Sequence, residues 1–327
     1  MTRSPKAPDT FPDGKRFAFT IIDDTDVATL ANVGPVYRLL EKLGFRTTKT
    51  VWPLACPEGS PNYGSSQTLE EPDYLAFVLD LQRRGFEIAF HGATMESSER
   101  ERTTRGLQSF SRLLHRSPRV HANHGHNREN LYWGAARFDD RLVRRVYVAL
   151  SGIPEDHFLG HVEGSPYWWG DLCVAEIEYV RNLTFRTVNL LRINPSLPYH
   201  DPRRPLVRRW FSASDAEGVT EFNRLLCERN QVKLEQEGGL CIVATHFGKG
   251  FVREGTVDRR TSRLLTRLAA RPGWYVPVGQ LLDWLAGQRG EDQLPAGEWT
   301  RMQRRWLRDL LSRQARHWLR RRLTRRW

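Results

Sequence analysis

The chain has 327 residues, of which 39% are hydrophobic and 11% aromatic, so it is long enough for one large α/β domain or two small ones with a packed core. No stretch approaches the roughly 20 apolar residues that a membrane span needs, and the polar first 16 residues lack the apolar segment of a secretory signal. Residues 299–327 carry eleven arginines and one aspartate, a net charge of +10 out of the total of +12, so the rest of the chain is nearly neutral and is not expected to bind polyanions in general.

The first predicted strand, residues 17–22, runs into three carboxylates: Asp23, Asp24 and Asp26. Carboxylates crowded at the end of a buried strand repel one another and lose hydration. A cation between them, or a general base among them, explains this arrangement. The alternative is a polar strand end in which Thr25 or Asp26 caps a helix that begins near Val27; it accounts for one acidic residue but not for three.

Strand and helix patterns alternate along most of the remaining chain. Further strands are predicted at residues 45–52, 86–90, 120–122, 187–193, 207–212, 240–245 and 274–276. Helices are predicted at residues 33–43, 72–84, 97–115, 168–182, 219–237, 261–270 and 278–285. This alternation indicates parallel strands joined by helical crossovers.

Polar side chains collect where four of these strands end. They are Asp23 with Asp24, then His91, then His124 with His126, and His246. Ligands of parallel α/β folds bind at the carboxyl ends of the strands, and we therefore expect these groups to meet in one site. A single histidine after a strand is more often a hydrogen-bonded loop residue, but four such positions together favour a functional site.

Three of these strand ends resemble the motifs of a known family. The segment 20–24 ends in Asp-Asp, and the segments 87–91 and 242–246 are apolar strands that each end in histidine. In order and spacing, over residues 17–285, they resemble the polysaccharide deacetylases (carbohydrate esterase family four, the NodB-homology group). The resemblance implies a distorted (β/α)7-type barrel. It also implies a metal-dependent hydrolase that removes an N-acetyl or other acyl group from a sugar in polysaccharide or glycoconjugate biosynthesis.

The resemblance also implies roles for individual residues. Asp23 would be the general base that activates water, and His246 the general acid that protonates the leaving amine. Asp24 and His91 would bind a divalent metal, with zinc expected and cobalt, nickel or manganese as alternatives. This chemistry is coherent, because a Lewis-acidic metal polarises an amide carbonyl while a carboxylate removes a proton and a histidine returns one.

One family ligand is missing. The family has a second metal-binding histidine four residues after the first, and this chain has Met95 there, whose thioether is a poor ligand for such ions. We expect His124 to supply the third ligand, with His126 contacting substrate or serving as the replacement ligand. Asp26 is a further candidate, either as a ligand or as a group behind one.

Loops rich in aromatic and polar residues follow, and they offer candidates for binding a sugar. Besides His126, we expect Asn127, Tyr132, Trp133 and Asp215 to contact substrate, since sugar rings have apolar faces and many hydroxyls. The alternative is that the aromatic residues in these loops belong to the core.

The chain divides into a polar tail (1–16), a barrel domain (17–285), a linker (286–298) and a basic amphipathic helix (299–327). Tryptophan on one face of the last segment and arginine on the other suits an anionic membrane surface. Nucleic acid and a protein partner are alternatives, and we expect no nucleic acid because so many tryptophans are not needed for phosphate contacts. Four scattered cysteines favour reduced thiols in the cytoplasm, with the protein peripheral on the inner face of the membrane.

Two other functions are compatible with the sequence. The first is a related metal hydrolase that acts on a glycosidic bond. The second is a glycan- or membrane-binding protein without activity, and the loss of a ligand at Met95 is its main support.

Overall fold

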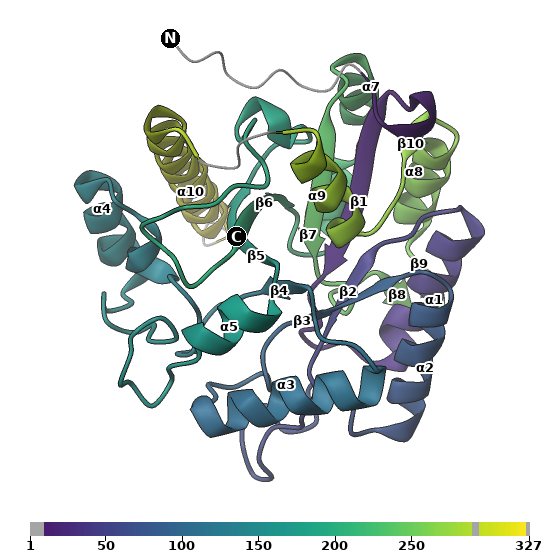
Figure 1. The fold of residues 1–327 in the computed structure, drawn as a ribbon. Helices are drawn as coiled ribbons and strands as arrows, with labels where there is room; N and C mark the ends of the chain where they lie inside the picture. The colour runs from purple at the N-terminus through teal and green to yellow at the C-terminus, as the bar shows by residue number, and fades with distance from the viewer. Residues whose placement is uncertain (1–9, 290–293, 325–327) are drawn as a thin grey trace.

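The computed structural model describes residues 10–289 and 294–324, with side chains described as far as residue 315. Its centre is a closed barrel of parallel strands (Figure 1). The barrel strands are β1 (Phe17–Asp23), β2 (Thr48–Val51), β3 (Glu87–Phe90), β4 (Val120–Ala122), β5 (Tyr179–Phe185), β6 (Arg209–Asp215) and β7 (Leu240–Thr245). Pairing of residues 18–23 with residues 240–245 closes the barrel between β1 and β7.

The barrel is distorted at β1. This strand pairs with β2 only near its carboxyl end, through Ile22 with Thr48 and Asp23 with Lys49. The short strand β10 (Gly273–Trp274) pairs with the beginning of β1 instead. A distorted (β/α)7-type barrel, expected from the sequence, is confirmed.

Helices surround the barrel, and β8 (Val252–Arg253) forms a small separate hairpin with β9 (Thr256–Val257). The helices are α1 (Leu30–Lys42), α2 (Pro72–Arg83), α3 (Arg100–Leu114), α4 (Arg141–Ser151), α5 (Gly170–Glu176), α6 (Val219–Leu225), α7 (Glu228–Gln236), α8 (Arg259–Ala269), α9 (Val278–Gly287) and α10 (Ala296–Thr324). None of these described helices combines the length and the apolar character of a segment that crosses a membrane.

The sequence prediction was wrong in the region around β5. The helix predicted at 168–182 ends at Glu176, and the following residues form β5, while the strand predicted at 187–193 contains a short 3-10 helix, Leu190–Arg192. β5 carries Arg181 and Asn182, both buried. A charged residue in the middle of a buried strand interrupts the apolar run from which a strand is predicted. The long helix predicted at 219–237 is two helices, α6 and α7.

The last helix, α10, begins within the segment predicted to be a linker and packs against the barrel domain. Trp299, Met302 and Trp306 are buried. The Trp306 ring lies 4.7 Å from that of Phe138, and the indole N–H of Trp299 donates to Asp139 at 2.6 Å. The apolar face of α10 is therefore occupied by the barrel domain over its first three turns.

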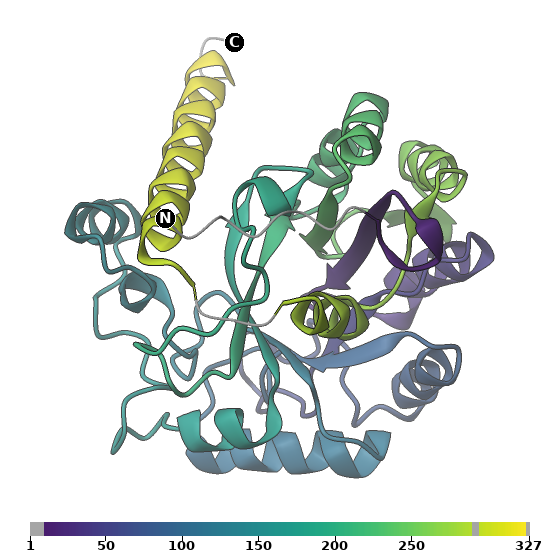
Figure 2. The same ribbon diagram turned by 45° about the horizontal axis from the view of Figure 1, so that its top comes forward.

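Beyond these turns α10 continues along β5 and β6 toward their carboxyl ends. Near its beginning, Glu298 accepts a hydrogen bond from the backbone N–H of Ser196. Farther along, Asp309 accepts one from the N–H of Arg186, directly after β5, and Arg313 pairs with Asp215 at the end of β6 at 3.0 Å. The end of the helix projects away from the barrel (Figure 2). The side chains of Trp318, Leu319 and Leu323 lie outside the described residues.

Docking of α10 is testable by unfolding. Replacing Trp306 with alanine removes a buried indole and leaves a cavity, and we expect the free energy of unfolding to fall by about 3–5 kcal/mol. Leu311, on the same helix, is 44% exposed, so Leu311→Ala should change it by less than about 0.5 kcal/mol. Urea denaturation of both variants measures this. Equal, small effects would show that α10 does not pack on the barrel in solution.

Candidate active site

The loop after β1 has an unusual backbone that brings Asp26 toward the barrel axis. Val27 has φ of +52°, which is rare for a β-branched residue. The amide of Asn32 donates to the Val27 carbonyl at 2.8 Å and stabilises this conformation. Helix α1 begins at Leu30 with Thr29 as its N-cap, so the alternative in which Thr25 or Asp26 caps the helix is wrong.

The loop after β7 packs directly on the loop after β1. A Cβ atom at Gly248 would lie 2.8 Å from the carbonyl oxygen of Val27, so only glycine allows this approach. The N–H of Asp24 donates to the Thr245 carbonyl at 2.8 Å and continues the β1–β7 pairing. Together these contacts place His246 beside Asp24 and Asp26.

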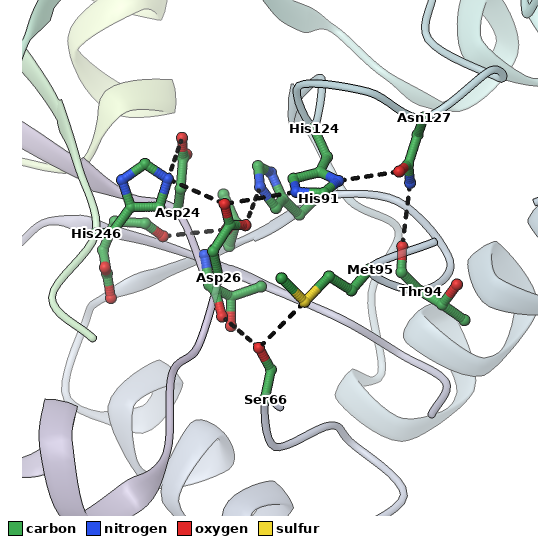
Figure 3. A network of polar contacts seen from close by, with 12 residues as sticks. Asp24, Asp26, Ser66, His91, Thr94, Met95, His124, Asn127 and His246 are labelled. Atoms are coloured by element: carbon green, nitrogen blue, oxygen red, sulfur yellow. Dashed lines mark hydrogen bonds and ion pairs between the residues drawn. The ribbon is translucent and has the colours of Figure 1, made fainter. Parts of the chain in front are cut away.

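Three histidines from three strands converge on the carboxylate of Asp26 (Figure 3). The Nε2 atoms of His91, His124 and His246 lie 3.2, 3.5 and 3.1 Å from its oxygens. The His246 Nε2 atom also lies 3.9 Å from Asp24. Four of the residues expected to meet, Asp24, His91, His124 and His246, are therefore brought together.

Asp24 is held by a cation. Arg181 of β5 donates from both terminal nitrogens to the two carboxylate oxygens of Asp24, each at 2.7 Å, and both side chains are buried. Burial acts to raise the pKa of Asp24, but the charge and hydrogen bonds of Arg181 outweigh it, so the pKa lies below its ordinary value. Asp24 is therefore a carboxylate rather than a carboxylic acid.

Asp23 lies in a different environment, fully buried in the barrel. Its Oδ2 atom accepts from the phenol of Tyr37 at 2.9 Å and pairs with the Nζ atom of Lys49 at 3.1 Å. Its Oδ1 atom accepts the backbone N–H of Phe247 at 2.8 Å. Both oxygens are thus engaged with the protein, and the hydrogen bond from Phe247 fixes the residue that follows His246.

The histidines have defined orientations. The Nδ1 atom of His246 lies 2.8 Å from the carbonyl of Glu217, to which it must donate. The Nδ1 atom of His124 lies 3.0 Å from Oδ1 of Asn127, whose amide nitrogen donates to Thr94, Glu96 and Glu129. We assign both tautomers from this network: in the neutral ring, each Nε2 lone pair faces Asp26.

Two lone pairs that face a carboxylate repel it unless a positive charge lies between them. Protonation of the rings supplies such a charge. Burial acts to lower the pKa of His124 and His246, but the hydrogen bond and charge of Asp26 outweigh it, so both pKa values lie above the ordinary value of histidine. Burial keeps the pKa of His91 below its ordinary value. The pKa of Asp26 is lowered, since hydrogen bonds from the histidines outweigh its burial.

A divalent cation is the other way to supply the charge. Within the described part of the chain, no group of three or more His, Cys, Asp or Glu side chains is already arranged as a metal cage. The donor chemistry nevertheless fits, because one carboxylate and neutral imidazoles, each with its second nitrogen hydrogen-bonded, form a typical ligand set. The contacts of Asp26 are divided between its two oxygens, with His91 on Oδ1 and His124 and His246 on Oδ2.

Met95 and His126 lie to the sides of this cluster. The Met95 sulfur accepts a hydrogen bond from Ser65 at 3.1 Å and is 3.9 Å from the hydroxyl of Ser66. His126 is exposed, and its carbonyl contacts His157. His126 as replacement ligand has no support in this geometry, whereas His124 is in place.

The other residues expected to bind substrate are dispersed. Asn127 is buried behind His124. The Tyr132 ring packs on His161 at 4.4 Å, and the guanidinium of Arg137 lies 4.1 Å from the Trp133 ring. Asp215 pairs with α10 through Arg313. Tyr132 and Trp133 are only partly buried and keep accessible surface.

Sequence reasoning missed Arg181 and underrated Asp26. Arg181 was assigned to a helix, where it could not face Asp24, and a single arginine carries no motif. For Asp26 a signal was available: the i, i+2 spacing of Asp24 and Asp26 places a second carboxylate in the same short loop.

The Lys49–Asp23 pair offers a test of the buried charge arrangement. Lys49→Met leaves the Asp23 carboxylate buried without its cation, and we expect a loss of about 3–5 kcal/mol in the free energy of unfolding. Adding Asp23→Asn should restore part of this loss, because the uncompensated charge is removed. Urea denaturation of the single and double variants measures both values; a loss below about 1 kcal/mol for Lys49→Met would contradict a buried ion pair.

No protein-family model and no curated protein sequence matches the chain. Several solved structures are similar to the chain. A protein from Mycobacterium smegmatis named as a candidate polysaccharide deacetylase matches with a TM-score of 0.51 at 14% identity, over 89% of this chain and 98% of that one. PuuE allantoinase is similar with a TM-score of 0.48 at 12% identity, over 84% of this chain and 92% of that one. A candidate polysaccharide deacetylase from Pseudomonas aeruginosa PAO1 is similar with a TM-score of 0.48 at 10% identity, over 86% of this chain and 95% of that one. The chain therefore shares the fold of this candidate polysaccharide deacetylase from Mycobacterium smegmatis.

Proposed function

We propose that this chain is a metal-dependent hydrolase that removes an N-acetyl or other acyl group from a sugar of a polysaccharide or glycoconjugate. The observation that supports it most is the convergence of three imidazoles on Asp26 beside a second carboxylate held by Arg181. This arrangement brings together groups suited to serve as a cation site, a base and an acid.

In this proposal Asp26, His91 and His124 hold the metal, with zinc as the first candidate and cobalt, nickel or manganese as alternatives. Asn127 behind His124 keeps the Nε2 lone pair free for binding. His124 thereby supplies the ligand that the family has at the position of Met95. When bound, the ion supplies Lewis acidity, which polarises an acyl carbonyl and lowers the pKa of water.

The resemblance implied that Asp23 is the general base and Asp24 a metal ligand. We instead assign the general base to Asp24. Asp23 has no exposed surface, and both its oxygens are engaged by Lys49, Tyr37 and Phe247. Asp24 is held rigidly by Arg181, and each of its oxygens keeps a second lone pair that can accept a proton from water. In this proposal Asp24 is therefore the base and Asp26 the metal ligand, the roles that the family motif implied for Asp23 and Asp24.

His246 is the proposed general acid. Its Nδ1 proton is fixed on the Glu217 carbonyl, so the proton it gives and recovers is the one on Nε2. This atom lies 3.9 Å from Asp24, the proposed base. Asp23 supports His246 through the neighbouring backbone N–H.

Substitutions in the cluster separate this assignment from the alternatives. Asp26→Ala should lose both the metal and activity. Asp24→Asn should keep the metal, because it is not a ligand, but slow acetate release by about 10²–10⁴-fold through loss of the base. Metal content of the purified protein and acetate released from acetylated oligosaccharides measure the two properties.

His126→Ala is the matched control and should retain the metal. An Asp24→Asn enzyme within threefold of the original rate would refute the base assignment. Release of new reducing ends instead of acetate would favour hydrolysis of a glycosidic bond. Glycan binding without turnover at any metal tested would favour the inactive binding protein.

We further propose that the end of α10 binds an anionic membrane surface and places the protein at the inner face of the membrane. Residues 312–327 carry seven arginines and no acidic residue. Trp299, Met302 and Trp306 are buried against the barrel domain, so the proposal now concerns only the projecting part of the segment 299–327. Each basic residue near such a surface contributes about 1 kcal/mol.

Exchanging Arg316, Arg320, Arg321 and Arg322 for glutamine should weaken binding to vesicles of anionic lipid by about 100-fold or more. The control exchanges four exposed arginines of α8: Arg259, Arg260, Arg263 and Arg267. Flotation with anionic and neutral vesicles measures the effect. Equal flotation with both kinds of vesicle, or equal loss in the control, would contradict an electrostatic role of this helix end.

A further inference from the structure

A cavity adjoins the cluster of histidines on the side of Met95. It has a volume of about 250 Å³, and we call it the side pocket. The loop between β2 and α2 forms most of its wall, including Leu54, Tyr63 and Ser65, and Met95 completes it. None of these residues has a part in the proposed catalytic chemistry.

The side pocket and the candidate active site share walls. Trp52 lines the pocket, and its ring packs on His91 at 4.6 Å and on the edge of His124 at 5.2 Å. Ser66 also lines the pocket, and its hydroxyl lies 3.3 Å from the carbonyl of Thr25, between Asp24 and Asp26. A molecule in the pocket therefore lies against the residues that hold the proposed metal.

Met95 lies between the side pocket and the cluster of histidines. Figure 3 shows its sulfur in contact with the hydroxyl of Ser66. The Ser65 hydroxyl donates to the carbonyl of Asn62 at 2.7 Å, and the Ser66 hydroxyl donates to the carbonyl of Thr25 at 3.3 Å. Each hydroxyl oxygen has lone pairs besides the proton it donates, so a ligand hydroxyl can donate a hydrogen bond to it.

The lining has the two kinds of surface that a sugar ring requires. Trp52, Leu54, Tyr63 and Met95 supply apolar and aromatic area, and other lining residues carry hydroxyls and amides. These are Asn62, Ser65, Ser66, Gln67 and Thr68. Tyr63 is 55% exposed, and its ring is therefore available to cover the apolar face of a ligand.

The charge of the lining selects against anions. Among the described residues that line the pocket there is no lysine or arginine, whereas Glu70 and Glu71 are both present. These carboxylates accept hydrogen bonds from the backbone N–H groups of Ala55 and Thr68 and are thereby held in the loop that lines the pocket. A carboxylate, sulfate or phosphate on the ligand would meet like charge without a cation to pair with.

We propose that the side pocket binds one uncharged pyranose ring, the neighbour of the sugar whose acyl group is removed. Its volume is slightly below the range of about 300–1,000 Å³ for ligand pockets, which fits one ring rather than an oligomer. The proposal rests on the proposed function for the identity of the neighbouring sugar, and it makes the substrate a neutral glycan rather than an acidic one.

The experiment measures binding and turnover separately. By calorimetry, the full-length protein should bind N-acetylated chitotriose, cellotriose or both, and should not bind the anionic trisaccharide of galacturonic acid. Tyr63→Ala should weaken binding of the neutral trisaccharide at least fivefold, while Tyr63→Phe, which keeps the ring, should stay within twofold of the original protein. Ala55→Trp, which fills the pocket, should abolish trisaccharide binding.

Hydrolysis of a small aryl acetate distinguishes failure of the pocket from failure of the proposed function, since this substrate has no second ring. Ala55→Trp should leave its rate unchanged. Unchanged trisaccharide binding in Ala55→Trp and Tyr63→Ala, tighter binding of the galacturonic acid trisaccharide, or no binding of either neutral trisaccharide overturns the side pocket. Pocket-dependent binding without acyl hydrolysis at any metal overturns the proposed function and leaves the pocket intact.

Discussion

The arrangement of the site depends on one electrostatic constraint: the Asp26 carboxylate is faced by three imidazole Nε2 atoms from three strands. Two of these rings are fixed so that their neutral form directs a lone pair at Asp26. Such an arrangement is stable only with added positive charge, from protons or from a metal ion. The strained backbone at Val27 and the close contact of Gly248 exist at this point because the loop must hold Asp26 there.

The three carboxylates at the end of β1 and in the loop after it have three different kinds of partner. Asp23 pairs with Lys49 of β2, Asp24 pairs with Arg181 of β5, and Asp26 pairs only with histidines. A permanent internal cation neutralises the first two, while the charge beside Asp26 can be exchanged. The division explains why three acids within four positions can be buried together.

Local patterns predicted the parallel strands and the meeting of their ends, namely apolar runs such as 240–245 and the polar residues that end them, while the barrel was implied by the resemblance. The sequence did not predict β5, because the buried Arg181 interrupts that strand and its partner Asp24 is 157 residues away. It also could not separate Asp23 from Asp24, since adjacent residues of one strand point to opposite sides and only the positions of Lys49 and Arg181 decide which carboxylate remains near the histidines. The burial of Trp299 and Trp306 was missed for a similar reason, because an amphipathic helix packs on a protein or lies on a membrane with the same pattern.

The loop that carries Met95 is connected to the cluster of histidines. The Met95 sulfur lies 3.1 Å from the hydroxyl of Ser65 and 3.9 Å from that of Ser66. The Nδ1 atom of His124 pairs with Asn127, whose amide donates to the carbonyls of Thr94 and Glu96 on either side of Met95. The loop that carries Met95 therefore orients the His124 ring, so in the proposed function this loop supports the metal site without contributing a ligand to it.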